Sequence, residues 1–252
     1  MRTRHFDHLT WPEVAEAAAR GAGVVIPVGS TEQHGYHMPL STDCLLPRAL
    51  ALAVAEEHDL LVAPAVSYGY RSRPLSGGGE GFPGTLSVSA ETLMRLVDEV
   101  LVALIRHGFR RLVVLNWHME NANFVYEAAW LARERAGGDA RILVCESAFA
   151  TLSEPTMELL FPDGFPGWDV EHAAILETSL MLHLHPDLVL MDRAVDDEAK
   201  RHPWYDVVPS PPDFVPVSGT LWKATQGNAE KGRVAWDEIV SVFGAAVATE
   251  LG

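Results

Sequence analysis

Hydrophobic positions along the chain form two kinds of segment. Short, nearly continuous apolar runs predict buried strands at residues 24–29, 60–66, 111–116 and 141–145. Longer segments rich in leucine and alanine predict helices at residues 45–57, 90–107, 122–136, 171–183 and 228–251. Pro64 suits the interior of the second strand badly. Strands that alternate with helices are typical of a mainly parallel sheet covered on both faces, so we expect an α/β, three-layer sandwich.

Two segments interrupt this alternation. Residues 68–87 are rich in glycine and serine, and residues 202–219 are rich in proline. Both are longer than the usual connections in a compact domain, so each is a candidate active-site loop. A flexible tether is the alternative, and it fits the proline-rich segment better because aromatic residues interrupt the other one. Since no break in composition divides the chain, residues 1–252 are expected to form a single domain.

Ligand-type side chains gather directly after two of the predicted strands. Glu32 and His34 follow the first strand, and Asp43 comes a few residues later. His118 and Glu120 follow the strand at residues 111–116. The members of each Glu/His pair are two residues apart, and in an extended segment such residues point to the same side. Because ligands bind beyond the carboxyl ends of parallel strands, both pairs are expected to face one crevice.

This set of two imidazoles and three carboxylates suits two divalent cations, with one carboxylate bridging them. Imidazole and carboxylate oxygen are ligands for zinc, and a carboxylate-rich site also suits manganese or magnesium. A hydroxide held between two cations about 3.5–4 Å apart is a strong nucleophile at neutral pH. Two interpretations without a metal stay open: Glu32 as a carboxylate at a helix N-terminus, and His118 as a packed histidine beside Trp117.

Charge and composition narrow the partners and the location. The sequence holds 34 Asp and Glu residues against 19 Lys and Arg residues, a net charge of −15, which disfavours nucleic acids and anionic membranes as partners. No apolar stretch reaches the roughly 18 residues that span a bilayer, and the N-terminus lacks the apolar segment of a secretory signal. The two cysteines, Cys44 and Cys145, are not a disulfide framework, so a reducing cytoplasm is the expected location.

The same motifs resemble the creatininase family. The resemblance covers residues 27–35 with Asp43, residues 116–121, and the stretches at residues 68–70, 76–79 and 82–85. It continues through residues 162–172 and 177–179, and so spans most of the chain. The resemblance implies an amidohydrolase with two divalent metal ions, Zn²⁺ or Mn²⁺, in each subunit of a homohexamer.

The resemblance also implies a role for individual residues. The implied metal ligands are Glu32 and His118 for one ion, His34 and Glu120 for the other, and Asp43 as the bridge. The implied substrate-binding residues are Ser76, Trp168, Asp169 and His172. His172 would protonate the departing nitrogen, because imidazole donates and accepts protons near neutral pH, and Glu177 would orient it. Glu120 is the second candidate for proton transfer. Without the resemblance, Trp168 is more simply a packing residue and His172 a satisfied histidine.

The implied reaction is hydrolysis of a C–N amide bond in a small substrate, creatinine or a creatinine-like lactam. The chain departs from the family pattern at Trp117, Met119 and Ala148, where the pattern has glycine, tyrosine and a second pocket tryptophan. An alanine at position 148 is expected to leave one face of the pocket open and to make creatinine a poor substrate. The alternatives are a peptide or a formamide of cofactor biosynthesis as substrate, and a non-catalytic protein that binds a ligand through its metals.

Overall fold

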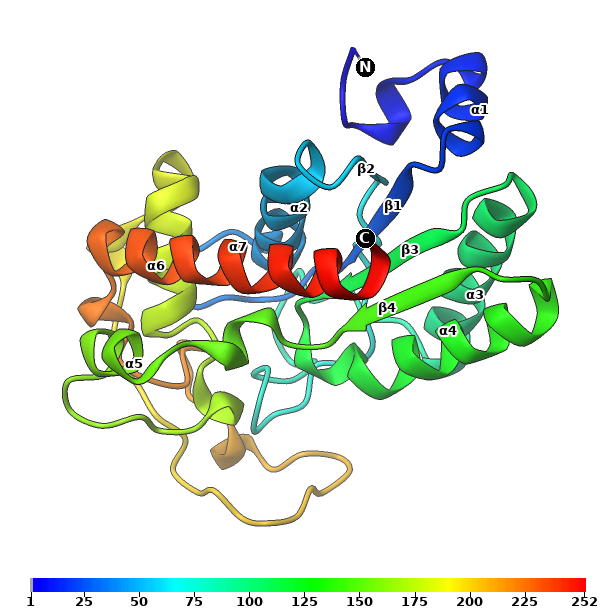
Figure 1. Ribbon diagram of the computed structural model, residues 1–252. Coiled ribbons are helices and arrows are strands. Elements are labelled where there is room, and N and C mark those ends of the chain that lie inside the picture. Colours follow the sequence, from blue (N-terminus) through cyan, green and yellow to red (C-terminus); the bar gives the residue numbers. More distant parts are fainter. Residues whose placement is uncertain (1) are drawn as a thin grey trace.

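Four parallel strands form the sheet at the centre of the computed structural model, which describes residues 2–252 (Figure 1). The strands are β1 (Gly23–Val28), β2 (Leu60–Val62), β3 (Arg111–Asn116) and β4 (Arg141–Cys145), in the order β2-β1-β3-β4. Val28 pairs with Asn116, so the two central strands end at the same level. The predicted parallel sheet is therefore confirmed, and β2 is shorter than predicted because it ends before Pro64.

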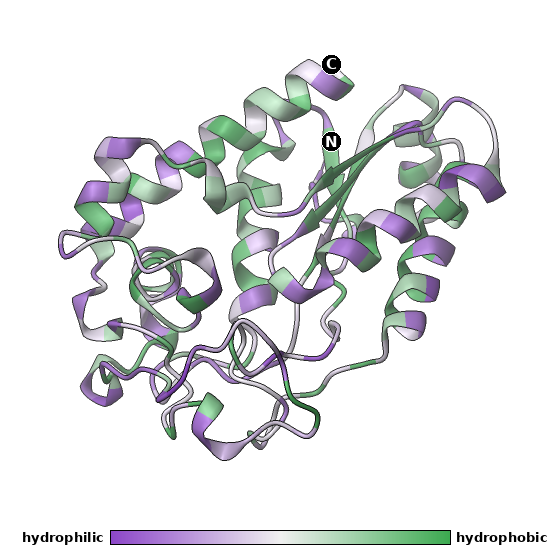
Figure 2. Cartoon of the chain, turned by 90° about the horizontal axis from the view of Figure 1, so that it is seen from below, coloured by the Kyte–Doolittle hydropathy of each residue, from purple (hydrophilic) through white to green (hydrophobic). Residues whose placement is uncertain are grey.

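Helices cover both faces of this sheet, as Figures 1 and 2 show. One face packs against α3 (Ala90–Arg106) and α4 (Ala122–Ala136), and the other against α2 (Thr42–Ala55), α6 (Ile175–Leu184) and α7 (Ala229–Leu251). Because side chains alternate along a strand, Val24 and Ile26 of β1 enter the first core and Val25 enters the second. The three-layer α/β architecture is confirmed.

Several shorter elements complete the chain. The helices α1 (Trp11–Ala19) and α5 (Glu154–Leu160) were not predicted from the sequence. Short 3-10 helices within residues 2–252 are η1 (Phe6–His8), η2 (Met119–Asn121), η3 (Ala148–Thr151), η4 (Trp168–Val170), η5 (Pro186–Leu188), η6 (Met191–Arg193), η7 (Pro212–Phe214) and η8 (Ala224–Gln226). None of the helices between residues 2 and 252 is both long and apolar enough to cross a bilayer.

The predicted helix at residues 171–183 was wrong at its start. Helix α6 begins only at Ile175, because Ala173 has a φ of 52°, a left-handed conformation that no α-helix contains. The Glu177 carboxylate accepts the Ala173 N–H at 2.8 Å and stabilises this turn. His172 is therefore presented from a turn before the helix rather than from the helix itself.

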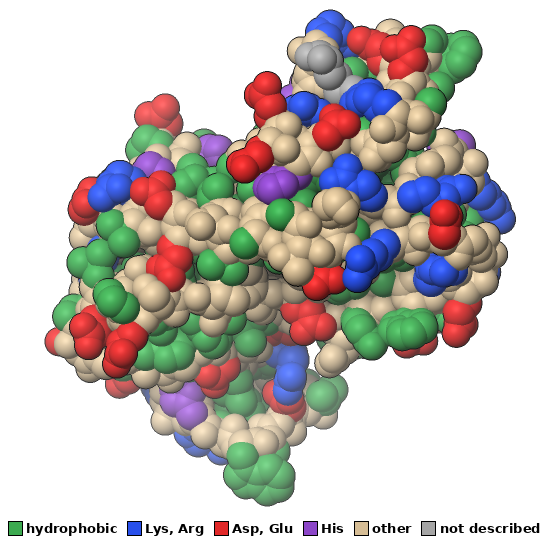
Figure 3. Space-filling model, viewed as in Figure 1, with side chains coloured by type: hydrophobic (Ala, Val, Ile, Leu, Met, Phe, Trp, Pro, Cys, Tyr) green, Lys and Arg blue, Asp and Glu red, His purple; other side chains and the backbone are tan. Residues whose placement is uncertain are grey.

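The two long segments both lie near the carboxyl edge of the sheet. The glycine-rich segment, residues 68–87, passes the ends of β1 and β3, where Tyr70 and Gly69 contact residues of both strands' loops. The proline-rich segment, residues 202–219, projects at the lower edge of Figures 1 and 3, and carries Trp204 and Val208 almost fully exposed. Just after this segment the chain returns to the interior, where the Leu221 N–H donates to the main-chain oxygen of His172.

Candidate metal centre

The ends of β1 and β3 bring Glu32, His34, Asp43 and His118 to one edge of the sheet. The shared level of Val28 and Asn116 lets the loops after both strands meet. Asp43 joins them from the first turn of α2, which packs tightly against the end of β1. A Cβ on Gly29 would lie 2.1 Å from the Asp43 main-chain oxygen, so the contact between β1 and α2 requires glycine there.

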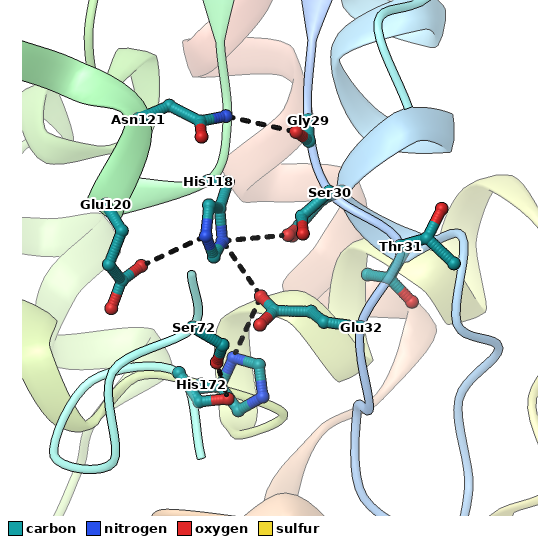
Figure 4. A network of polar contacts seen from close by, with 12 residues as sticks. Gly29, Ser30, Thr31, Glu32, Ser72, His118, Glu120, Asn121 and His172 are labelled. Atoms are coloured by element: carbon teal, nitrogen blue, oxygen red, sulfur yellow. Dashed lines mark hydrogen bonds and ion pairs between the residues drawn. The ribbon is translucent and has the colours of Figure 1, made fainter. Parts of the chain in front are cut away.

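His118 presents its Nδ1 atom to this cluster (Figure 4). Nδ1 lies 2.9 Å from Glu32 Oε1 and 3.3 Å from Asp43 Oδ2. On the other side of the ring, Nε2 lies 3.0 Å from the main-chain oxygen of Tyr70, which can only accept a hydrogen bond. The Nε2–H therefore donates to Tyr70, and the lone pair of Nδ1 faces the carboxylates, as in a metal-ligating histidine. Packing beside Trp117 alone does not account for this orientation.

His34 has the opposite ring nitrogen turned to the cluster. Its Nδ1 lies 3.2 Å from the main-chain oxygen of Glu32, so Nδ1–H donates there. Its Nε2 faces Asp43 Oδ1 at 3.2 Å and Glu177 Oε2 at 3.6 Å. The two oxygens of Asp43 thus face two different histidines, His34 and His118.

Two groups of three buried ligand atoms share Asp43. They are Glu32, Asp43 and His118, and His34, Asp43 and Glu177, and the atoms of each group lie within 4.8 Å of one another. A third group, Glu32, His34 and His172, overlaps with both. Glu177 thus lies beside His34, in the place that the family resemblance implied for Glu120. The only sequence signal for Glu177 was its position at residues 177–179 of the family resemblance, where it was assigned to orient His172.

Glu120 lies apart from these groups. It belongs to the 3-10 helix η2, and its Oε2 is 3.5 Å from His118 Nε2, the ring nitrogen that faces away from Glu32 (Figure 4). The Ser76 hydroxyl donates to its other oxygen. Among residues 2–252, no group of candidate ligand atoms includes Glu120. The resemblance implied that Glu120 and His34 share a metal ion, but the structure does not bring these two side chains together.

Burial and charge act in opposite directions on the pKa values of this cluster. Burial alone would raise the pKa of Asp43, but His34 and His118 hold it well below its usual range. Burial lowers the pKa of both histidines, and the surrounding carboxylates outweigh it and raise each pKa well above the usual value. The cluster therefore strongly favours positive charge at its centre.

Three ligand atoms at the centre have no hydrogen-bond partner among the described residues. They are Glu32 Oε2, His34 Nε2 and Asp43 Oδ2, and all three are buried. Buried polar atoms without a partner are rare in native proteins. These three are atoms that ligate metals, and they lie in the overlapping groups described above. The residues present therefore fit a pair of divalent cations, which would replace the protons on the histidines.

A narrow cavity, partly open to solvent, leads to the cluster. Its wall is aromatic: Trp117 packs on Phe149 with ring centroids 5.3 Å apart, and Phe149 packs on Trp168 at 5.2 Å. Phe149, rather than Ala148, lines this wall. The face that an alanine was expected to leave open therefore carries an aromatic ring, and Met119 lines the cavity elsewhere.

Three of the four predicted substrate-side residues line the cavity. They are Ser76, Trp168 and His172, whereas Asp169 is exposed and is not among the lining residues. His172 Nδ1 lies 3.9 Å from Glu32 Oε1 (Figure 4). Sequence reasoning missed Glu171, a buried carboxyl that also lines the cavity and accepts the Leu176 N–H at 2.6 Å. Burial, with the charge of Glu177 nearby, raises the pKa of Glu171 well above its usual value.

Comparisons with known proteins place this chain in a family. The family model for creatinine amidohydrolase, the creatininase model, matches residues 7–247. The chain belongs to the creatininase family. Creatinine amidohydrolase from Pseudomonas putida is 43% identical over 247 residues, which cover 96% of this chain and 95% of that protein. A mycofactocin precursor peptide peptidase from Mycolicibacterium smegmatis is 36% identical over 178 residues, 68% of this chain and 62% of that protein.

Solved creatininase structures have the same fold as this family member. The crystal structure of creatinine amidohydrolase superposes with a TM-score of 0.95 at 40% identity and covers 99% of this chain and 98% of that one. A Zn-Zn form of a mutant creatininase gives a TM-score of 0.94 at 40% identity, with 99% of both chains covered. A mutant creatininase complexed with creatine gives 0.95 at 39% identity, again with 99% of both chains covered. As a creatininase-family protein, the chain is a hydrolase that acts on C–N bonds.

Proposed function

We propose that this creatininase-family chain hydrolyses the C–N bond of a small, flat amide, creatinine or a creatinine-like lactam, with two divalent cations. The observation that carries the proposal is the position of Asp43. Its two oxygens face His34 and His118, and each histidine belongs to a separate group of three ligand atoms. One carboxylate shared between two such groups is suited to hold two cations side by side.

The donor atoms suggest which residues hold each cation. The proposed ligands are Glu32, Asp43 and His118 for one cation, and His34, Asp43 and Glu177 for the other. Zn²⁺ and Mn²⁺ both accept such imidazole and carboxylate ligands. When bound, the cations polarise a substrate carbonyl and lower the pKa of a coordinated water. With Glu177 as a ligand, Glu120 is left for proton transfer.

Glu120 is the residue that we assign to accept a proton from the attacking water. Its carboxylate lines the cavity next to the cluster, and the Ser76 hydroxyl holds one of its oxygens. Ser76 itself is part of the glycine-rich segment and lines the same cavity. A positioned carboxylate that takes a proton in this way contributes typically about 10²–10⁴-fold to a rate.

His172 is the proposed proton donor to the departing nitrogen. Its Nδ1 is the ring nitrogen on the side of the cluster, 3.9 Å from Glu32 Oε1, and the ring borders the cavity. An imidazole group is suited to this step because it gives and takes protons near neutral pH. Glu120 and His172 would then divide the two proton transfers of amide hydrolysis between them.

The aromatic wall favours a flat and compact substrate. Phe149 and Trp168 offer ring faces and edges on which a planar heterocycle packs. The cavity is narrow, because only about 30 Å³ of it is open to the centre of a water-sized sphere, far less than the roughly 300–1,000 Å³ usual for small-molecule pockets. A peptide remains the second candidate, because the similar peptidase from Mycolicibacterium smegmatis is named for a precursor peptide. The narrow, ring-lined cavity supports the small amide over the peptide.

The test is to load the protein with Zn²⁺ or Mn²⁺ and incubate it with creatinine or, separately, with a linear tripeptide. We expect creatine to form from creatinine, and we expect Phe149→Ala to raise the KM for creatinine about 3- to 10-fold through the loss of ring packing. The metal content of Phe149→Ala should be unchanged. Cleavage of the tripeptide, with creatinine left intact, would refute a small, flat amide as the substrate. Failure of the fully loaded protein to cleave either compound would refute the proposed function as a whole.

A further inference from the structure

Gln33 lies between two proposed ligands, Glu32 and His34, but is turned away from both. The segment after β1 is extended there, and Thr31 bridges to Leu86, so alternate side chains point to opposite sides. The Gln33 side chain is buried and does not line the cavity. A buried amide in this place must find its hydrogen bonds within the protein.

Neighbouring main-chain groups determine the orientation of the Gln33 amide. Oε1 accepts the Gly35 N–H at 2.9 Å, and Nε2 donates to the main-chain oxygen of Gly219 at 2.9 Å. In the flipped orientation, an oxygen would face the Gly219 oxygen and an NH₂ group would face the Gly35 N–H. The amide nitrogen is therefore the atom that faces His172.

Gln33 holds one ring nitrogen of His172 from two directions. His172 Nε2 lies 2.8 Å from the Gln33 amide nitrogen and 2.9 Å from the Gln33 main-chain oxygen. The first group donates to Nε2 and the second accepts from it, so either tautomer of the ring finds a partner without moving. Both groups belong to Gln33, and the opposite ring nitrogen, Nδ1, is left facing the cavity side.

The glycine-rich and the proline-rich segments both pack against the Gln33 side-chain amide. A Cβ on Gly78 of the glycine-rich segment would lie 2.2 Å from Gln33 Nε2. A Cβ on Gly219 of the proline-rich segment would lie 1.9 Å from Gln33 Oε1. Both glycines also have φ values near 80°, which other residues rarely adopt. The two segments are therefore shaped to admit this side chain, and the space around it is filled.

We propose that Gln33 is a positioning residue that holds the His172 ring with Nδ1 toward the cavity and ties both loops to it. The inference rests on the proposed role of His172 in the reaction. Gln33 does not reach the substrate in this arrangement, and its effect on turnover passes through the orientation of the His172 ring. Ring misplacement on the scale of an ångström costs about 10²-fold in rate.

A double-mutant cycle on the Mn²⁺-loaded protein, with creatinine as substrate, tests this coupling. Gln33→Met keeps the side-chain length but removes every hydrogen bond of the amide, so that only the main-chain oxygen still holds His172 Nε2, and we expect kcat to fall about 10²-fold with KM changed less than about threefold. In the His172→Ala background, Gln33→Met should lower kcat no further, because its effect passes through the missing ring. Independent losses that multiply would overturn the proposal.

Tyr36→Phe is the matched control. The Tyr36 hydroxyl donates to the main-chain oxygen of Val217, so this change loosens the same proline-rich segment without touching His172. We expect a small effect, equal in both backgrounds. If Tyr36→Phe reproduced the loss seen with Gln33→Met, then loop anchoring would be the cause and the proposal would fail.

The position of the ring gives a readout that needs no substrate. A crystal structure of Gln33→Met should show the His172 ring rotated or shifted from the Glu32 side, and an unmoved ring would contradict the proposal. Gln33→Asn serves the same purpose if the methionine variant does not fold, since its amide is one methylene too short to reach His172 and Gly219 together. Full activity of His172→Ala on creatinine would instead remove the proton donor itself, and with it the role of Gln33.

Discussion

The two Glu/His pairs of this chain look alike in sequence but differ in the structure. Glu32 and His34 both turn to the buried cluster, where their side chains lie in the groups of ligand atoms around Asp43. Of the second pair, only His118 does so. Glu120 lies against the far side of the His118 ring and is held by Ser76.

Backbone conformation explains the difference. The chain after β1 stays extended, so residues two apart point to the same side. After β3 the chain stays extended only as far as His118 and then forms the 3-10 helix η2 from Met119. A 3-10 helix has about three residues per turn, so Glu120 points to a different side from His118. A spacing of two residues thus predicts a shared ligand site only where the backbone remains a strand.

The largest expected effect concerns the residue that joins the two groups. Asp43→Ala should reduce the bound metal from about two divalent ions per chain to nearly none and abolish hydrolysis, because Asp43 serves both groups. Elemental analysis of purified protein measures this directly. Asp98→Ala is the control, since Asp98 is a buried aspartate of α3 paired with Arg135, away from the cluster. Loss of one ion with the other retained would show that Asp43 does not bridge.

The second prediction separates the two glutamates that were equivalent in sequence. Glu32→Gln should lose at least one metal ion, because a buried carboxylate ligand becomes a neutral amide. Glu120→Gln should keep its full metal content and lower kcat by about 10²–10⁴-fold, as removal of a general base does. Metal analysis and turnover on the same preparations decide the matter. Equal metal loss in both variants would mean that Glu120 is a metal ligand in the same way as Glu32, and would contradict this prediction.

The smallest expected effect lies one contact further out. Ser76→Ala removes the hydroxyl that donates to Glu120 but leaves every proposed metal ligand in place. Because a hydrogen bond to a charged group contributes about 1.5–3 kcal/mol, we expect kcat to fall at least about 10-fold, with metal content unchanged. Combining Ser76→Ala with Glu120→Gln should add little to the loss. A full additional loss in the double variant would mean that Ser76 acts on the substrate independently of Glu120.

The order of strands and helices could be predicted from the sequence because it depends on local pattern. The runs at residues 111–116 and 141–145 became β3 and β4 with the predicted bounds, and residues 122–136 became α4. The position of Glu32, His34, Asp43 and His118 at one edge also followed, because parallel strands end together. These features depend on hydrophobic periodicity and on the direction of strands, and the sequence displays both.

Only the tertiary structure decided which carboxylate stands beside His34. Glu177 is more than 140 residues from His34 along the chain, and it reaches the cluster because α6 packs on the same face of the sheet as α2. The left-handed turn at Ala173 and the 3-10 helix at Glu120 each involve only a few residues. Neither has a hydrophobic period that a sequence reveals. The sequence likewise did not reveal that Phe149, rather than Ala148, lines the cavity wall. Side-chain direction outside regular strands and helices depends on packing between distant segments, so the pattern of residues predicts the edge on which the site lies but not the arrangement of the atoms within it.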